Sequence, residues 1–167
     1  MELLIVRHGP AGDRDAWRRA GRPDEKRPLT ARGRDKTRQA AAGLARAVGR
    51  LDLTAASPWT RAAQTATLVA RACGGAVVER VELIPDRRPE ELLAWLATRR
   101  ERRVALVGHE PHLSRFASWL LTGRTRSFLL LKKSQTLLME LPRPRSGAAV
   151  LLWSLSPRQL RALGRKS

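Results

Sequence analysis

Short apolar runs that alternate with helical patterns are the feature that most restricts the fold of this chain. The runs at 3–6 and 104–107 contain no polar side chain, which is typical of strands buried on both faces of a sheet. Further strands are predicted at 51–56 and 76–83, and a pair joined by the turn PRPRSG at 134–141 and 148–154. Each of the first four strands precedes a polar turn or loop, so a sheet with its strand ends at a common edge is expected.

Helix signals fill the segments between the strands. Capping residues or helix-starting prolines stand before the helical patterns, at Thr30, Ser57-Pro58, Pro89, Pro111 and Ser156-Pro157. The segment 10–28 is polar and rich in glycine and proline, which indicates a long loop with about one turn of helix. The alternation predicts one α/β domain over residues 1–167, a three-layer α/β/α sandwich with a mostly parallel central sheet.

Composition restricts the class of protein. The chain has 167 residues, of which 43% are hydrophobic, enough for one domain with a core of its own. Its single cysteine, Cys73, falls on the apolar face of a predicted helix and cannot form a disulfide within the chain. No apolar run reaches membrane-spanning length, and the start of the chain lacks the pattern of a signal peptide. The cytoplasm is the expected compartment, and no membrane is expected as a partner.

The charge of the chain is strongly positive, at +18, with 33 basic and 15 acidic side chains. Arginines are scattered through nearly every segment, which favours a compositional bias towards arginine on solvated faces. No basic segment is interleaved with aromatic residues, so a role in binding nucleic acid is disfavoured. An anionic substrate or an anionic partner surface is compatible with the charge in either case.

The positions of the histidines point to a site. There are three, and two of them, His8 and His109, each lie two residues after an apolar run, at 3–6 and at 104–107. The first and fourth strands can lie side by side in such a sheet, which would bring both imidazoles into one cleft at the strand ends. Arg7 belongs to the same turn as His8, and Arg61 lies at the start of the helix that follows the second strand. Guanidinium groups and helix N-termini both favour a phosphoryl group there.

Four stretches resemble those of a known family, the histidine phosphatase superfamily (branch 1), named for its RHG motif. They are IVRHG at 5–9, RPLTARG at 27–33, SPWTRAAQTA at 57–66 and VGHEPHL at 107–113, and WSLSP at 153–157 is also similar. The stretches span nearly the whole chain in the order of the family. They are most similar to its short bacterial type, the SixA-like phosphohistidine phosphatases. The resemblance implies a phosphoglycerate mutase-like fold and a hydrolase.

The resemblance also implies roles for individual residues. His8 matches the histidine that attacks phosphorus and becomes phosphorylated. Arg7 and Arg61 match the arginines that hold the phosphoryl oxygens, and His109 matches the second histidine of the phosphate pocket. All four are expected to be catalytic, with the last three also binding substrate.

Further residues are candidates for substrate binding at the pocket rim and for proton donation. Arg27 resembles an additional substrate-binding arginine at the pocket rim, and Asp24 matches an acidic residue suggested as a proton donor. Glu82 lies roughly where related phosphatases carry their acid, so it is the competing donor. Glu110 is expected near the pocket without an assigned role, whereas a structural role is favoured for His112. Trp59 would lie near the cleft and shape access to it.

The expected reaction needs no cofactor and no metal. A histidine attacks as a neutral imidazole, and positioned cations stabilise the negative charge of the equatorial phosphoryl oxygens. The sequence has no cysteine and histidine spacing typical of zinc and no acidic cluster typical of magnesium.

Three functions are compatible with these features. The first is a phosphatase that removes phosphate from phosphohistidine on a protein. The second is a phosphatase of small phosphate monoesters, in which the partner is a phosphorylated metabolite. The third is a basic polyanion-binding module without catalysis, which the intact set of motifs disfavours.

Overall fold

A single six-stranded sheet organises the molecule in the computed structural model, which describes residues 1–165. Its strand order is β3-β2-β4-β1-β5-β6. The strands are β1 (Glu2–Arg7), β2 (Leu53–Ala56), β3 (Ala76–Glu79), β4 (Arg103–Gly108), β5 (Thr136–Glu140) and β6 (Val150–Leu155). Strand β5 is antiparallel to both β1 and β6, and the other pairings are parallel. The predicted α/β class with a mostly parallel sheet is confirmed.

The central strands are neighbours in space although they are far apart in sequence. In the register of β1 with β4, Val6 lies opposite Val107 and Arg7 lies opposite Gly108. The backbone N–H of His8 continues this ladder by donating to the carbonyl oxygen of Gly108, at 3.0 Å. The ends of the first and fourth strands therefore meet at one edge of the sheet, as the apolar runs predicted.

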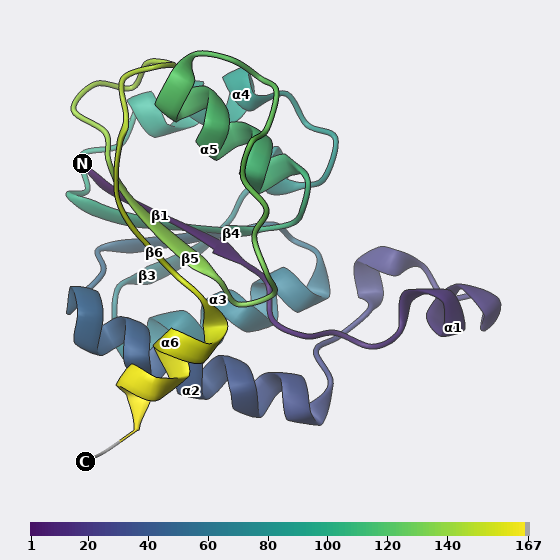
Figure 1. Cartoon of the computed structure of the whole chain (residues 1–167). Helices are drawn as coiled ribbons and strands as arrows, with labels where there is room; N and C mark the ends of the chain where they lie inside the picture. Colours follow the sequence, from purple (N-terminus) through teal and green to yellow (C-terminus); the bar gives the residue numbers. More distant parts are fainter. Residues whose placement is uncertain (166–167) are drawn as a thin grey trace.

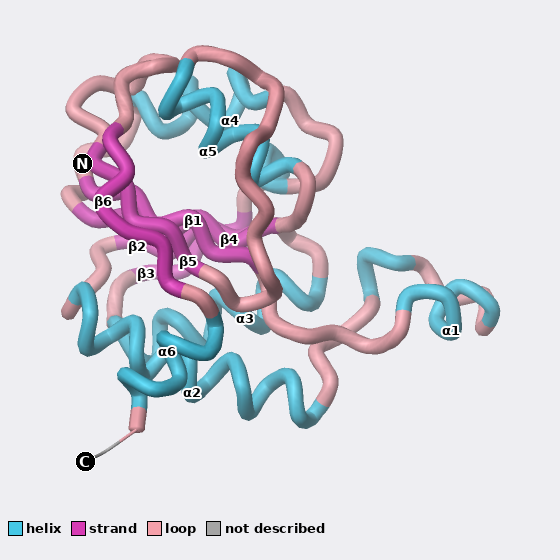
Figure 2. The backbone as a smooth tube through the Cα atoms, viewed as in Figure 1, coloured by secondary structure: helices cyan, strands magenta, loops and turns pink. Residues whose placement is uncertain are grey.

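Helices cover both faces of the sheet and complete the three layers (Figures 1 and 2). One face carries α2 (Ala31–Val48), α3 (Thr60–Cys73) and α6 (Pro157–Gly164), and the other carries α4 (Pro89–Ala97) and α5 (His112–Thr122). Alternate residues of β1 supply the two cores. Leu3 and Ile5 pack with α4 and α5, whereas Leu4 and Val6 pack with α2 and α3. In the described residues no helix is long and apolar enough to cross a membrane.

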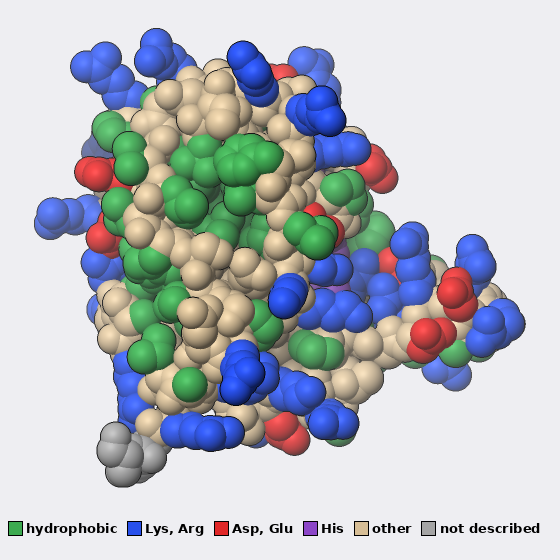
Figure 3. All heavy atoms as spheres, in the orientation of Figure 1, with side chains coloured by type: hydrophobic (Ala, Val, Ile, Leu, Met, Phe, Trp, Pro, Cys, Tyr) green, Lys and Arg blue, Asp and Glu red, His purple; other side chains and the backbone are tan. Residues whose placement is uncertain are grey.

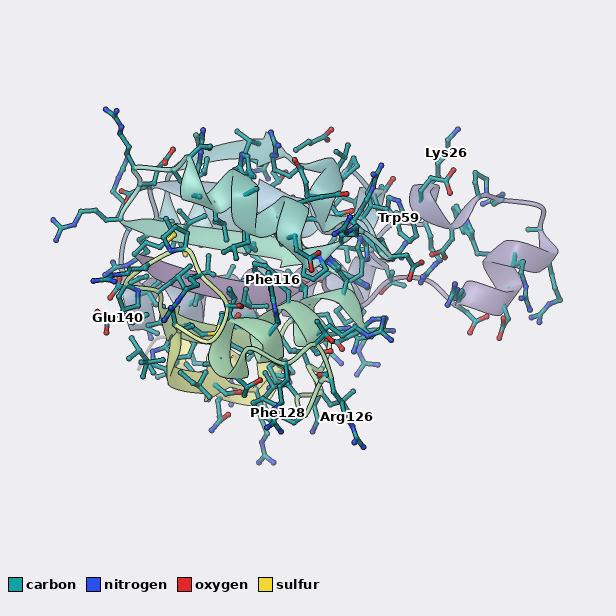
Figure 4. All side chains as sticks on the ribbon, turned by 90° about the horizontal axis from the view of Figure 1, so that it is seen from above. Lys26, Trp59, Phe116, Arg126, Phe128 and Glu140 are labelled. Atoms are coloured by element: carbon teal, nitrogen blue, oxygen red, sulfur yellow. The ribbon has the colours of Figure 1, made fainter. Side chains whose placement is uncertain are left out.

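The segment between β1 and α2 extends outwards from the body as an arm (Figures 1 and 4). It contains α1 (Arg14–Arg19), which has no buried residue, and the 3₁₀ turn η1 (Asp24–Lys26). The sequence predicted a long loop with about one turn of helix here, and the structure has somewhat more helix. The arm leads back to the body at η1, where Asp24 contacts the site described below.

Several element boundaries differ from the sequence prediction, among them the end of β3 and the starts of α3 and α5. Strand β3 ends at Glu79, because the chain then forms the 3₁₀ turn η2 (Val81–Leu83). Helix α3 begins at Thr60 and not at Pro58, because the Ser57 backbone still belongs to the strand ladder through its bond to the carbonyl oxygen of Val107. Pro111 is the N-cap of α5 and not its first residue.

Candidate active site

His8 lies at the edge of the sheet where β1 ends, and its ring is fixed in one tautomer. Nδ1 lies 2.7 Å from the carbonyl oxygen of Gly9, which can only accept, so Nδ1 carries the proton. Nε2 accepts a hydrogen bond from Nε of Arg61 at 3.2 Å. Burial lowers the pKa of His8 to about 3, with the nearby cations adding to that lowering, so the ring is neutral at neutral pH. A neutral ring with a free lone pair on Nε2 is the form that a nucleophilic imidazole requires.

His109 lies beside His8, at the end of β4. The two ring centroids are 5.1 Å apart, and the centroid of the Trp59 ring lies 4.9 Å from that of His109. Nε2 of His109 pairs with the Ser57 hydroxyl at 3.0 Å. Burial lowers the pKa of His109 to about 2, with the charges of His8 and Arg61 acting in the same direction. Ser57 therefore holds a ring of the site instead of capping α3.

Arg7 is tied to the chain segment that crosses the end of β1. Its Nη1 donates to the carbonyl oxygen of Leu131 at 2.6 Å. Burial lowers the pKa of the Arg7 guanidinium, and the charge of Glu110 offsets part of this effect. Burial also raises the pKa of Glu110, whose Oε1 has no hydrogen-bond partner within residues 1–165. Glu110 thus lies next to the site, as the sequence predicted, where the charge of Arg7 acts on it.

Arg61 and Arg27 share one carboxylate, that of Asp24. Nη2 of Arg61 lies 2.9 Å from Oδ2 and Nε of Arg27 lies 2.8 Å from Oδ1. Nη1 of Arg61 also donates to the backbone oxygen of Asp24 at 2.7 Å. Burial raises the pKa of Asp24, but the Arg27 hydrogen bond and the surrounding positive charges outweigh it, so the net pKa is lowered. At neutral pH the carboxylate is ionised and holds both guanidinium groups in place.

The motif residues between these side chains have structural reasons. A Cβ on Gly9 would lie 2.0 Å from Oγ1 of Thr37, so only glycine fits between β1 and α2. The Gly9 N–H donates to Oγ1 of Thr65, in the RAAQT stretch, at 3.0 Å. Gln64 of the same stretch accepts from the backbone N–H of Leu29, in the RPLT stretch, at 2.9 Å. These bonds connect three of the sequence motifs to one another.

The structure thus connects Asp24, Arg61, His8 and His109 through direct contacts, and Arg7 lies in the same turn as His8. Arg27 joins them through Asp24. The structure does not bring in Glu82, whose carboxylate is paired with Arg80. His112 is buried, and neither of its ring nitrogens has a hydrogen-bond partner among the described residues. Figure 3 shows histidine atoms among Lys and Arg side chains where the arm meets the body. Trp59 lies in the same region (Figure 4).

Sequence reasoning missed Lys133, whose charge contributes to lowering the pKa of His8. No motif marks this residue, because it reaches the site by folding of the segment between α5 and β5. Residues 1–165 contain no group of three or more His, Cys, Asp and Glu side chains that could hold a metal ion.

Comparison with known proteins identifies the family. The family model described as histidine phosphatase superfamily (branch 1) matches residues 3–85, the stretch with the RHG, RPLT and RAAQT motifs. An uncharacterized protein of Picosynechococcus sp. is 34% identical over 153 residues, which cover 89% of this chain and 87% of that protein. The chain belongs to branch 1 of the histidine phosphatase superfamily.

Solved structures of similar fold extend the likeness beyond the matched stretch. The protein histidine phosphatase SixA in complex with tungstate has a TM-score of 0.81 and 25% identity, covering 96% of this chain and 99% of that one. A protein from Agrobacterium tumefaciens proposed to be a SixA phosphohistidine phosphatase has a TM-score of 0.75 and 23% identity, covering 93% and 97%. Phosphoserine phosphatase from Entamoeba histolytica in complex with 3-phosphoglyceric acid has a TM-score of 0.65 and 15% identity, covering 95% and 98%. This member of the histidine phosphatase superfamily therefore has the phosphoglycerate mutase-like fold that the resemblance implied, and it is a phosphatase of that superfamily.

Proposed function

We propose that this phosphatase removes phosphate from phosphohistidine on a protein, through a phosphohistidine intermediate on its own His8. The observation that carries the proposal is the state of the His8 ring. Its proton is held on Nδ1 by Gly9, and Nε2 faces the Arg61 guanidinium beside the second imidazole. An imidazole in this state can attack an electrophilic phosphorus without first losing a proton.

In the first step, Nε2 of His8 forms a bond to phosphorus while the P–N bond to the substrate histidine breaks. Positive charge develops on the His8 ring, and the carbonyl oxygen of Gly9 stabilises it through the Nδ1 proton. Arg7 and Arg61 neutralise the equatorial oxygens, and Arg61 turns its Nε donor from His8 to the phosphoryl group. The leaving imidazole departs as a neutral ring when its other nitrogen carries a proton.

In the second step, water attacks the phosphorylated His8 and releases inorganic phosphate. The P–N bond to His8 breaks, and Nε2 recovers its lone pair. The sum of both steps is hydrolysis of phosphohistidine to histidine and phosphate. His109 lies beside the transferred group in both steps and acts as a neutral hydrogen-bonding partner of the phosphoryl oxygens.

The choice of a phosphohistidine substrate depends on the acid that the site offers. An alkoxide leaving group needs a protonated acid, whereas an imidazole that is already protonated does not. The acidic residue that contacts the site arginines, Asp24, has a lowered pKa and is ionised at neutral pH. We therefore assign Asp24 to positioning Arg27 and Arg61, and not to proton donation. The arm extends outwards beside the site (Figure 1).

The test is phosphate release from a histidine-phosphotransfer domain phosphorylated on its histidine, compared with a panel of small phosphate esters. We expect hydrolysis of the phosphorylated domain, its loss in His8→Ala, and an acid-labile phosphoryl group trapped on the wild type but not on that variant. His112→Gln, a buried histidine outside the proposed machinery, is the matched control. Efficient His8-dependent hydrolysis of a small ester, with none of the phosphorylated domain, would replace the proposal by the small-ester phosphatase.

A further inference from the structure

The segment between α5 and β5 crosses the end of β1 and is fastened to the nucleophile's own backbone. The N–H of Ser134 lies within 3.0 Å of the carbonyl oxygen of Arg7 and 3.2 Å of that of His8. The Arg7 N–H donates to the carbonyl oxygen of Gln135 at 3.1 Å, in addition to the side-chain bond from Arg7 to Leu131. Four hydrogen bonds thus hold residues 131–135 against Arg7, which ends β1, and His8, which follows it.

This fastening fixes a tight turn that carries two lysines. The N–H of Gln135 donates to the carbonyl oxygen of Lys132 at 2.8 Å, and the Gln135 side chain accepts from the Lys132 N–H at 2.9 Å. Ser134 adopts a φ of 64°, in the left-handed region, and its buried side chain lies 3.4 Å from Oγ1 of Thr37. The backbone of Lys133 is therefore one residue away from a direct bond to the His8 backbone.

Lys133 is electrostatically part of the site. Partial burial lowers the pKa of the Lys133 ammonium, the charges of the three site arginines lower it further, and the charge of Asp13 offsets part of this effect. The charge of Lys133 in turn contributes to lowering the pKa of His8. No carboxylate of residues 1–165 forms a salt bridge with Lys133. An anion bound among these cations would offset their mutual repulsion.

We propose that Lys133 is a fourth phosphate-pocket cation, which contacts an oxygen of the substrate's phosphoryl group. The inference rests on the proposed function, since it names a further binding residue of the same site. The charge of Lys133 adds to those of Arg7, Arg27 and Arg61, which Asp24 offsets in part, so that the site stays positive and suits a phosphoryl dianion.

The flexible stem of lysine suits this position. The Lys133 side chain is exposed, so its ammonium can follow the phosphoryl group as the group moves from substrate to His8 and then to water. The site arginines Arg27 and Arg61 are buried and held by Asp24, which limits them to smaller adjustments. Lys133 is thus expected to contribute to binding and to the transition state alike.

The test compares Lys133→Met with Lys132→Met, a matched change of the neighbouring exposed lysine in the same turn. Two quantities are measured: the dissociation constant of tungstate, as an oxyanion probe, and kcat/KM on the phosphohistidine domain. We expect Lys133→Met to weaken tungstate binding and lower kcat/KM by roughly tenfold each, the loss of one partly solvated charged contact. Lys132→Met should change both by less than about twofold, as for an ordinary surface charge.

Lys133→Arg serves as the conservative variant and should recover most of the tungstate affinity. Equal effects of Lys133→Met and Lys132→Met on both quantities would overturn the inference while leaving the proposed function intact, provided that activity still depends on His8. Absence of any phosphatase activity in the wild type would overturn the proposed function. The tungstate comparison would still decide whether Lys133 belongs to the pocket.

Discussion

His8 is held neutral by its surroundings, and this has a consequence for stability. Its pKa is about 3 in the folded protein, against 6.5 for an unperturbed histidine. The unfolded chain therefore binds more protons below pH 6.5, and the stability contribution that is present above this pH is lost as the pH falls. We therefore expect the free energy of unfolding to fall by about 2 kcal/mol from pH 7 to pH 5 because of this one buried neutral ring.

A double difference isolates this effect from other titrating groups. Denaturant unfolding is measured at pH 7 and at pH 5 for the wild type and for His8→Asn, which keeps a polar side chain but does not titrate there. The decrease in the free energy of unfolding from pH 7 to pH 5 should be smaller in the variant by about 2 kcal/mol. An identical loss in both proteins would show that His8 is protonated in the folded state at pH 5.

Single residues of the site differ in how far the sequence could predict them. Arg7, His8 and His109 follow strand ends, and the strands that carry them are continuous apolar runs, so their convergence follows from pattern alone. The hydroxyl of Ser57 looked like a helix cap because a Ser-Pro pair is a common helix start. In the folded protein β4 lies beside β2, and the Ser57 hydroxyl forms a hydrogen bond with His109, which follows β4.

The 3₁₀ turn η1 connects the arm to the site through one carboxylate, which leads to a prediction on this element. Asp24→Asn removes the charge that holds Arg27 and Arg61. We expect kcat/KM to fall by about tenfold, because two buried guanidinium groups lose their shared partner. If the carboxylate only positions them, the fall should be similar for aryl phosphates, which have good leaving groups, and for alkyl phosphates, which have poor ones.

A proton-donating carboxylate would give a different pattern. The loss would then be much larger for alkyl than for aryl phosphates, because only the alkoxide leaving group needs protonation in the transition state. Glu82→Gln is the control, since its carboxylate is paired with Arg80 and not with a residue of the site. A selective loss on alkyl phosphates in Asp24→Asn would return the acid role to that residue, and the same loss in Glu82→Gln would assign it to Glu82.

Elements were predictable in kind and order, but their ends were set by contacts outside them. The segment 76–83 reads as one strand, yet only Ala76–Glu79 pairs with a neighbouring strand, because β2 is itself four residues long. Beyond Glu79 the chain turns, and Leu83 joins the core under α4 instead of extending the sheet. The sequence pattern of one strand does not indicate how long the neighbouring strand is.

Over the whole molecule, the alternation of strands and helices predicted the layers, and the adjacency of the first and fourth strands followed from doubly wound topology. The antiparallel pairing of β5 with β6 followed from their short connection, a hairpin signal. What the sequence could not supply is the path between α5 and β5, residues 123–135, which carries no regular pattern. That path determines which lysine reaches the site.

The net charge of +18 comes from basic residues in nearly every segment of the chain, and its effect on function can be separated from that of the pocket. If the charge serves to attract an acidic phosphoprotein, kcat/KM on that substrate should fall with salt through the association rate, by roughly tenfold between 0.05 and 0.5 M ionic strength. For a small aryl phosphate the fall should be weaker, because it presents fewer charges to the field. Viscosity dependence of kcat/KM identifies whether association limits the rate.

The competing explanation is a polyanion-binding module, whose binding would be independent of the site. Tight binding of single-stranded nucleic acid, steeply salt-dependent and unchanged in His8→Ala, would be its signature. Because the arginines occur in nearly every segment instead of gathering in one basic stretch with aromatic side chains, we expect weak nucleic-acid binding that physiological salt abolishes. Equal salt dependence for the phosphoprotein and the small ester would indicate that the charge acts only within the pocket, where Arg7, Arg61 and Lys133 meet the phosphoryl group.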